Sequence, residues 1–207
     1  MKTPAMNKSL CLGVTGGIGS GKSYVCRMLE QRGVPVFYTD DEAKLEMRSN
    51  TAIHQELCAI IGPEVLDACG RPVKDILSQY IRQSAAHAQR VNDIVHPRVR
   101  ERAMRWLNSM HHSSITAIEC ALLFESGFNS LCQKTLTVSA PLQVRINRIC
   151  HRDNITPAKA REWIGLQMPQ EEKIRLSDYV ICNDGTQNID RQVDHIVKIL
   201  LHDSQNC

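Results

Sequence analysis

Long apolar runs are absent from this sequence, and their absence is the first constraint on its class. No stretch comes close to the roughly 20 apolar residues that a membrane-spanning helix requires, so we expect no membrane partner. Residues 1–9 contain lysines without the apolar core of a secretory signal, so we expect no targeting segment there. Internal repeats are lacking too. The 207 residues, 43% of them apolar, are enough for one domain with a full core.

Paired cysteines are also missing. The nine cysteines form no C-x-x-C pair and are odd in number, which is not typical of a disulfide framework or a structural zinc site. Cys11, Cys26, Cys120 and Cys182 fall in apolar runs and are expected to be small core residues. The pattern indicates a reducing compartment, so we expect a cytoplasmic protein.

An excess of one charge is lacking as well. Lysine and arginine number 25 against 22 aspartates and glutamates, giving a net charge of +3. A nucleic-acid-binding domain of this size usually carries a much stronger basic balance. We therefore expect no nucleic-acid partner.

One glycine-rich stretch is present near the start of the chain. Residues 16–23 read GGIGSGKS and fit G-x-x-x-x-G-K-[ST], the phosphate-binding P-loop, between a predicted strand at 10–14 and a predicted helix at 24–31. The glycines allow backbone N–H groups to approach phosphate oxygens, and the helix N-terminus adds positive potential. We expect Lys22 to reach the β- and γ-phosphates and Ser23 to hold Mg²⁺. The alternative is a glycine-rich turn without a ligand.

Short apolar strands alternate with helices along the rest of the chain. Strands are predicted at 34–38, 115–120, 135–138 and 179–182, which with the first strand indicates an α/β fold with a five-stranded parallel sheet covered on both faces. Ligands of such sheets gather at the carboxyl ends of the strands. Residues 64–110 show no strand pattern and predict a helical insertion on the substrate side, with a break at Pro97. Helices are expected at 24–31, 41–47, 51–61, 73–83, 85–95, 99–107, 142–150, 156–168, 171–176 and 189–201.

Several acids follow predicted strands. Asp40 comes just after strand 34–38, on the expected P-loop edge, where it could accept a proton from an attacking hydroxyl; a helix N-cap is an equally good interpretation. Asp41 falls in the first helical turn and is expected to serve the helix dipole. Glu119 could lie near Mg²⁺ and its bound water, or be a buried acid paired with the loop. Glu125 is interpreted as a turn cap.

Two basic runs could meet phosphates. Arg145, Arg148 and Arg152 lie in a segment that could close over ATP and neutralise charge on the transferred phosphoryl group. A solvated helix face is the alternative, and it fits Arg145 equally well.

The second basic run follows His96 and Pro97. Some of its arginines could bind an acidic substrate, although most are expected to be surface residues. His96 itself is more simply interpreted as structural than catalytic. The run comprises Arg98, Arg100, Arg102 and Arg105.

Taken together, these residues resemble the dephospho-CoA kinase family, P-loop kinases that phosphorylate the ribose 3′-hydroxyl of dephospho-CoA. The resemblance covers nearly the whole chain. It rests on VTGGIGSGKS at 14–23, Thr39-Asp40 with Ala43, His96-Pro97-Arg98-Val99, LLFESG at 122–127, Arg148 with Arg152-Asp153, Gln167, and DYVICNDG at 178–185.

The resemblance implies a three-layer P-loop kinase fold, with a CoA-side insertion at about 64–110 and a small lid at about 145–175. It implies ATP-dependent phosphorylation of dephospho-CoA to coenzyme A and ADP, the last step of coenzyme A biosynthesis. ATP and dephospho-CoA would be its partners and Mg²⁺ its cofactor. The protein would be a monomer or a small homo-oligomer.

The resemblance also implies site residues. The catalytic residues would be Asp40 as general base, Lys22 and Arg148, and Ser23 would bind Mg²⁺. The substrate side would comprise Asp40, His96, Arg100, Leu123 and Glu125. ATP would be bound by Gly17, Ile18, Gly19, Ser20, Gly21, Lys22, Ser23, Tyr24, Arg148, Arg152, Asn183 and Gly185.

The chain departs from the family pattern at a few positions, all outside the P-loop and the expected base. Tyr38 replaces a usual Asp, Ala121 a usual Pro, Arg145 a common Gln, and Val73-Lys74 a usual Asp-Arg. Another nucleoside or nucleotide kinase, or a nucleotide-binding sensor without catalysis, are the alternatives. A GTP-dependent switch is disfavoured because the Asn-Lys-x-Asp guanine signal is absent.

Overall fold

The computed structural model describes residues 9–205, so the expectation about a targeting segment falls almost wholly outside the described residues. The chain divides into two compact units. The first comprises the described parts of Met1–Phe37 and Trp106–Cys207, and the second is Tyr38–Arg105. Within residues 9–205 no helix is both long and apolar enough to cross a membrane, and no disulfide joins the cysteines.

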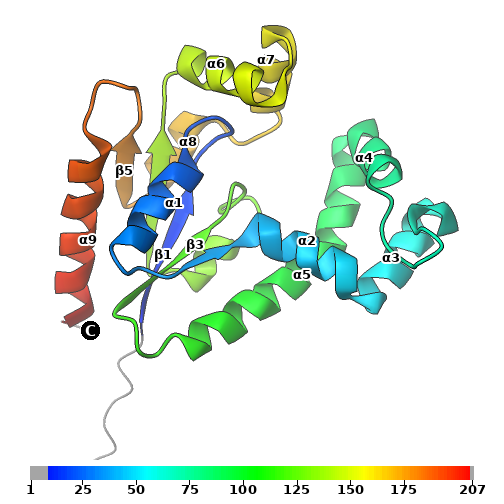
Figure 1. Cartoon of the computed structure of the whole chain (residues 1–207), viewed down its shortest axis with the longest axis horizontal. Helices are drawn as coiled ribbons and strands as arrows, with labels where there is room; N and C mark the ends of the chain where they lie inside the picture. Colours follow the sequence, from blue (N-terminus) through cyan, green and yellow to red (C-terminus); the bar gives the residue numbers. More distant parts are fainter. Residues whose placement is uncertain (1–8, 206–207) are drawn as a thin grey trace, which may run out of the picture. The chain divides into compact units, whose positions relative to one another are not determined.

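The first unit contains the five-stranded parallel sheet that the sequence predicts, except for the last residue of β2, in the order β2-β3-β1-β4-β5 (Figure 1). β1 and β3 are buried along their whole length, because strands of a parallel sheet are covered on both faces. The register pairs Thr15 with Thr137 and Val14 with Glu119, so the loops after β1, β3 and β4 leave the sheet at the same edge. The strands are β1 (Leu10–Thr15), β2 (Val36–Tyr38), β3 (Ile115–Glu119), β4 (Lys134–Ser139) and β5 (Tyr179–Cys182).

Helices cover this sheet. α1 and α9 contact each other, and Arg32, the C-cap residue that follows α1, donates to Asp194 of α9 at 2.6 Å. α8 contacts β4. α6 and α7 share a small apolar core of their own, built from Ile146, Ile149 and Ala160. The helices are α1 (Lys22–Gln31), α6 (Leu142–Asp153), α7 (Pro157–Gly165), α8 (Gln170–Leu176) and α9 (Ile189–Gln205), with the 3-10 turn η2 (Phe128–Leu131).

The second unit is helical, as the lack of a strand pattern predicts. Arg98 of α5 pairs with Glu56 of α3, and Arg102 of α5 pairs with Glu42 and Glu46 of α2. These pairs fix α5 against the helices before it. The elements are α2 (Thr39–Ser49), α3 (Thr51–Ile61), the 3-10 turn η1 (Pro63–Val65), α4 (Lys74–Gln83) and α5 (Ala85–Ser109), whose last turn belongs to the first unit.

Two local predictions are wrong. α5 continues through Pro97, because its buried face, with Val95 before the proline and Val99 after it, keeps its helical spacing across that residue. α2 begins at Thr39 with Tyr38 at its N-cap position, so Asp40 lies in the first helical turn and does not cap the helix. In α5 the packing of the buried face outweighs the local signal of the proline.

Candidate active site

The loop between β1 and α1 turns tightly around its glycines. Gly21, at the N-cap position of α1, has φ 97°, which an L side chain rarely adopts. A Cβ atom on Gly21 would lie 2.2 Å from Nδ2 of Asn183, and one on Gly17 would lie 2.3 Å from Nη2 of Arg145. Glycine at both positions therefore allows polar side chains from distant elements to reach the loop backbone.

Three consecutive carbonyl groups of this loop, those of residues 18–20, accept hydrogen bonds from side chains outside it. Arg145 Nε donates to the first at 2.9 Å. Arg148 Nη1 donates to the second at 3.3 Å and to the third at 3.2 Å, and Asn183 Nδ2 also donates to the third, at 2.8 Å. Side chains of α6 and of the turn after β5 thus hold the loop by its carbonyl groups, while the N–H groups of Ile18 and Ser20 donate to Gln167 and to the Gly17 carbonyl. A loop fixed in this way at the N-terminus of a helix is a typical anion-binding site.

Arg145 is a buried residue, and the solvated-face interpretation of this arginine is wrong. Only 5% of its surface is exposed, although it lies on α6 in a basic run of the kind typical of a solvated helix face. Burial lowers the pKa of its guanidinium, with the charge of Glu171 acting in the opposite direction. A guanidinium so close to the loop adds positive charge where a triphosphate would bind.

Lys22 and Glu119 meet at the carboxyl edge of the sheet. Lys22 Nζ lies 3.3 Å from Glu119 Oε1, and the side chains are 12% and 6% exposed. Glu119 is thus a buried acid paired with the loop, one of the two roles expected from sequence. Burial and the charge of Glu119 raise the pKa of the nearby Cys26 thiol, which keeps that thiol protonated and unreactive.

Oxygen donors suited to Mg²⁺ lie in the same region. The described residues contain no cluster of three or more His, Cys, Asp and Glu side chains that could hold a metal by themselves. Mg²⁺ commonly takes one or two protein oxygens and completes its shell with phosphate and water. The exposed Ser23 hydroxyl and the Glu119 carboxylate are oxygen donors of this kind, so the residues present fit a phosphate-bound Mg²⁺.

The remaining nucleotide-side residues fall into two groups. Asn183 is buried and accepts a hydrogen bond from Arg148 on its side-chain oxygen at 3.0 Å, so these two residues and the loop are brought together. Arg152, in contrast, is directed to its neighbour Asp153, with Nη2 and Oδ2 2.7 Å apart, and is largely exposed. Tyr24 is also exposed.

The turn after β5 carries Gly185. The Asp184 carboxylate accepts hydrogen bonds from the backbone N–H groups of Thr186 and Gln187, and these bonds lower the pKa of Asp184 to about 2. The turn is therefore held by an ionised carboxylate at every physiological pH.

The second unit brings Asp40 and His96 together. Asp40 is exposed in the first turn of α2, and its negative charge acts on the half-buried imidazole of His96. Burial lowers the pKa of His96, while the charges of Asp93 and Asp40 oppose that effect. Arg100 follows His96 by one helical turn on α5 and so lies on the same helix face. Asp41 pairs with Lys44 at 2.8 Å.

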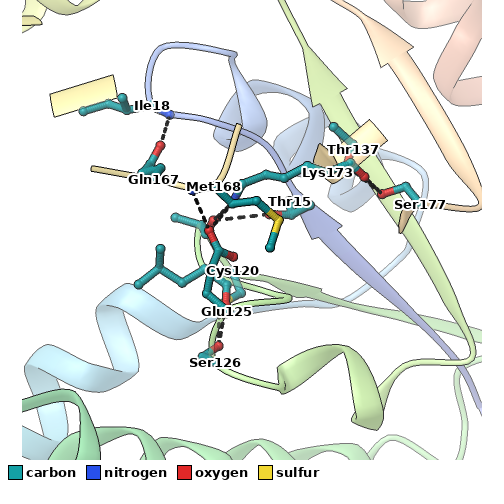
Figure 2. A network of polar contacts seen from close by, with 12 residues as sticks. Thr15, Ile18, Cys120, Glu125, Ser126, Thr137, Gln167, Met168, Lys173 and Ser177 are labelled. Carbon is teal, nitrogen blue, oxygen red and sulfur yellow. Dashed lines mark hydrogen bonds and ion pairs between the residues drawn. The ribbon is translucent and has the colours of Figure 1, made fainter. Parts of the chain in front are cut away.

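Leu123 and Glu125 lie in the loop after β3. Leu123 is fully buried, with its methyl groups close to Gly13 of β1, so its side chain packs inside the first unit. The Glu125 carboxylate accepts a hydrogen bond from Lys173 Nζ at 2.8 Å and one from the Met168 N–H at 3.2 Å (Figure 2). Glu125 therefore does more than cap a turn: its carboxylate links the loop after β3 to α8 and to the residue Met168 that precedes that helix.

Two polar residues of this region were given no role from sequence. Lys173 lies in a short helix rich in charges, a pattern typical of a solvated surface, yet its side chain is 0% exposed. No pattern in the sequence indicated this burial. Gln167 Oε1 accepts a hydrogen bond from the Ile18 N–H of the loop at 2.8 Å. Its only sequence signal was its place in the family resemblance.

Comparisons with known proteins agree with this geometry. A family model described as dephospho-CoA kinase matches residues 10–188. A dephospho-CoA kinase from Bacteroides fragilis (strain YCH46) is 39% identical to this chain over 189 residues, which cover 91% of this chain and 92% of that protein.

Solved structures give the same result for the fold. The crystal structure of TT1252 from Thermus thermophilus is similar with a TM-score of 0.78 and 30% identity, covering 94% of this chain and 97% of that one. A dephospho-CoA kinase structure from Campylobacter jejuni has a TM-score of 0.66 at 21% identity, covering 95% of this chain and 98% of that one, and it supports the fold alone.

Proposed function

This chain belongs to the dephospho-CoA kinase family, and from that premise we propose how its residues carry out the ATP-dependent phosphorylation of dephospho-CoA in coenzyme A biosynthesis. The γ-phosphoryl group of ATP passes to the ribose 3′-hydroxyl of dephospho-CoA, giving coenzyme A and ADP. The loop after β1 binds the triphosphate. The arginine-held glycine loop at the N-terminus of α1 carries this proposal, because two guanidinium groups and a helix N-terminus in one place attract phosphate oxygens.

On the nucleotide side, Lys22 contacts the β- and γ-phosphates and Arg148 adds positive charge beside them. The buried Glu119 supports this role, because it holds the Lys22 ammonium group at the carboxyl edge of the sheet. Charge that develops on the transferred group is then stabilised by donors that need little rearrangement. Gly17 to Tyr24, Arg152, Asn183 and Gly185 complete the proposed ATP contacts.

Mg²⁺ would be held by the Ser23 hydroxyl, with Glu119 close by, and would supply charge neutralisation on the phosphates. The protein's own contribution is to orient the nucleotide and to exclude water from the transfer, which limits wasteful ATP hydrolysis.

On the acceptor side, Asp40 is the general base that takes the proton of the attacking hydroxyl. It follows β2 by two residues, is exposed, and forms no ion pair with any described residue, unlike its neighbour Asp41. His96 and Arg100, on the α5 face that Asp40 influences, contact the substrate. Contacts of Leu123 and Glu125 with the substrate, a monomeric or small homo-oligomeric state and a cytoplasmic location stay predictions.

Replacing Asp40 by asparagine tests the base. Asp40→Asn keeps the size of the side chain but cannot accept the proton, so we expect turnover to fall by at least about a hundredfold while ATP binding changes little. ADP release is measured with and without dephospho-CoA, and ATP affinity by calorimetry.

Asp41→Asn is the matched control, because it removes the same charge from the adjacent residue and breaks only an exposed ion pair. We expect its turnover within about twofold of the wild-type value. Near-normal turnover of Asp40→Asn would refute the base assignment, and ADP release that does not depend on dephospho-CoA would refute the proposed acceptor.

A further inference from the structure

Lys173 is a buried cation that the proposed mechanism does not use. Its side chain is 0% exposed, and its Nζ atom donates to the Ala121 carbonyl at 2.7 Å and to Glu125 Oε1 at 2.8 Å. A buried charge is costly unless it is paired and hydrogen-bonded, so these two acceptors fix the position of the ammonium group closely.

The backbone of Lys173 is fixed as well. Its carbonyl accepts hydrogen bonds from the hydroxyls of Thr137 at 3.2 Å and Ser177 at 2.9 Å, and these two hydroxyls lie 2.6 Å apart (Figure 2). Thr137 belongs to β4 and pairs in register with Thr15 of β1. Lys173 is therefore anchored to the central sheet at one end and to the loop after β3 at the other.

A first route leads from Lys173 to the start of the phosphate-binding loop. The Ala121 carbonyl that accepts from Lys173 Nζ also accepts from Thr15 Oγ1 at 3.3 Å. Thr15 is the last residue of β1 and directly precedes Gly16. The ammonium group of Lys173 thus helps to set the point at which the chain leaves the sheet.

A second route leads to the middle of the loop. Glu125 Oε1, held by Lys173, accepts the Met168 N–H at 3.2 Å. Gln167, the preceding residue, accepts the Ile18 N–H at 2.8 Å through its side-chain oxygen. The loop amide is therefore oriented by a glutamine whose backbone is fixed by the Lys173–Glu125 pair.

From these contacts we infer that Lys173 is a positioning residue for ATP binding, which orients the phosphate-binding loop through Glu125, Met168 and Gln167. The inference rests on the proposed function only for the assignment of this loop to ATP. The hydrogen bonds of the side chain and carbonyl of Lys173 go to Ala121, Glu125, Thr137 and Ser177 and not to the loop itself, so its effect must pass through the residues it holds, as for ligands oriented by a second layer of hydrogen bonds.

The test measures ATP affinity in a double-mutant cycle. Lys173→Met removes the charge at similar length, and Gln167→Ala removes the acceptor at the loop. We expect each to weaken ATP binding by about tenfold, the loss of one well-placed polar interaction. Because both act on the same loop amide, we expect the double variant to bind ATP only slightly more weakly than either one, and not about a hundredfold more weakly than the wild type.

Glu125 provides a conservative pair of variants. Glu125→Gln keeps an oxygen acceptor for Lys173 and Met168, whereas Glu125→Ala removes it. We expect Glu125→Gln to retain ATP affinity within about threefold and Glu125→Ala to resemble Lys173→Met. Should Lys173→Met fail to fold, the cycle of Glu125→Ala with Gln167→Ala tests the same route.

Asp178→Asn is the matched control for a merely structural effect. Asp178 Oδ2 accepts hydrogen bonds from the backbone N–H and the hydroxyl of Thr135, the second residue of β4, which pairs in register with Gly13 inside β1 and not with a residue of the loop. We expect this variant to lower the melting temperature without weakening ATP binding. Additive losses in the cycle, unchanged ATP affinity in Lys173→Met, or an equal loss in Asp178→Asn would each overturn the inference.

The two proposals can fail separately. If the wild-type protein binds ATP but does not phosphorylate dephospho-CoA, the proposed acceptor is wrong while the cycle still decides the role of Lys173. If the wild-type protein phosphorylates dephospho-CoA and the variants bind ATP normally, only the inference about Lys173 is wrong.

Discussion

At the scale of single residues, the half-buried imidazole of His96 is a group whose charge depends on its surroundings. Burial disfavours the imidazolium, so the pKa of His96 lies below its ordinary value of 6.5 in spite of the nearby charges of Asp93 and Asp40. The imidazole is therefore neutral at neutral pH and can both donate and accept a hydrogen bond. That suits contact with a substrate hydroxyl better than contact with a phosphate.

The lowered pKa of His96 predicts a pH dependence of stability. Above about pH 6.5 the imidazole is neutral in both the folded and the unfolded chain, so it contributes no difference between them. As the pH falls below that value, the unfolded chain binds the proton first, and the free energy of unfolding decreases until the pH passes the folded-state pKa. We expect His96→Gln to lose less thermal stability than the wild type between about pH 7 and pH 5.

Thermal unfolding at a series of pH values measures this difference. His195→Gln, which replaces an exposed histidine of α9, is the control and should keep the wild-type pH dependence. Parallel curves for the wild type and His96→Gln would contradict the prediction.

The roles of individual residues were harder to predict from the sequence than the fold. The P-loop pattern located Lys22 and Ser23 because glycine spacing at a strand–helix junction has few other uses. Nothing local distinguished the buried Arg145 from a surface arginine, or the buried Lys173 from the exposed charges around it. Arg145 binds Ile18, more than a hundred positions away in the sequence, and Lys173 binds Glu125, about fifty positions away. The spacing of apolar residues along the chain does not predict contacts of this kind.

At the scale of elements, strands were predicted better than helix ends. The apolar strands of a parallel sheet have few other interpretations, and the sheet was confirmed. The observed helix ends differ from the predicted ones. α1 begins at Lys22, two residues before the predicted start, and α9 continues to Gln205, beyond the predicted end at residue 201. The break predicted at Pro97 was wrong because the long apolar face of α5 outweighs the loss of one backbone hydrogen bond.

Pro97 is therefore expected to cost stability. A proline inside a helix leaves the carbonyl four residues earlier, that of Asp93, without its helical donor, and it is less favourable than alanine by about 3 kcal/mol. We expect Pro97→Ala to raise the melting temperature by several degrees, as measured by calorimetry.

Pro157 provides the matched control, because it occupies the first position of α7, where its missing N–H would have no helical partner. Pro157→Ala should not raise the melting temperature. A melting temperature of Pro97→Ala at or below the wild-type value would show that α5 is adapted to its proline.

At the scale of the whole molecule, the proposed contacts divide between the two compact units. The proposed ATP contacts fall in the unit that contains the sheet, whereas Asp40, His96 and Arg100 fall in the helical unit Tyr38–Arg105. The sequence predicted a helical insertion at 64–110 but did not place α2 and α3 in the same unit. The boundary between two compact units depends on which residues contact each other, and amino-acid composition does not reveal it.

This division predicts separate protection by the two substrates. A non-hydrolysable ATP analogue should slow amide hydrogen exchange mainly in the loop of residues 16–23 and in α6. Dephospho-CoA should slow exchange mainly around Asp40 and in α5. Hydrogen exchange read by mass spectrometry measures both, with each ligand alone. Protection by dephospho-CoA confined to the sheet unit would contradict the proposed acceptor residues.

The contacts between α6 and the phosphate-binding loop limit which substitutions are tolerated in either element. Ile18 packs against the core of the α6–α7 hairpin, and Arg145 fills the space that the missing side chain of Gly17 leaves open. A hairpin transplanted from a relative that lacks this arginine would leave a void beside Gly17, and a bulkier residue at that glycine would collide with the guanidinium. A substitution at Gly17 is therefore expected to be tolerated only together with a change at Arg145.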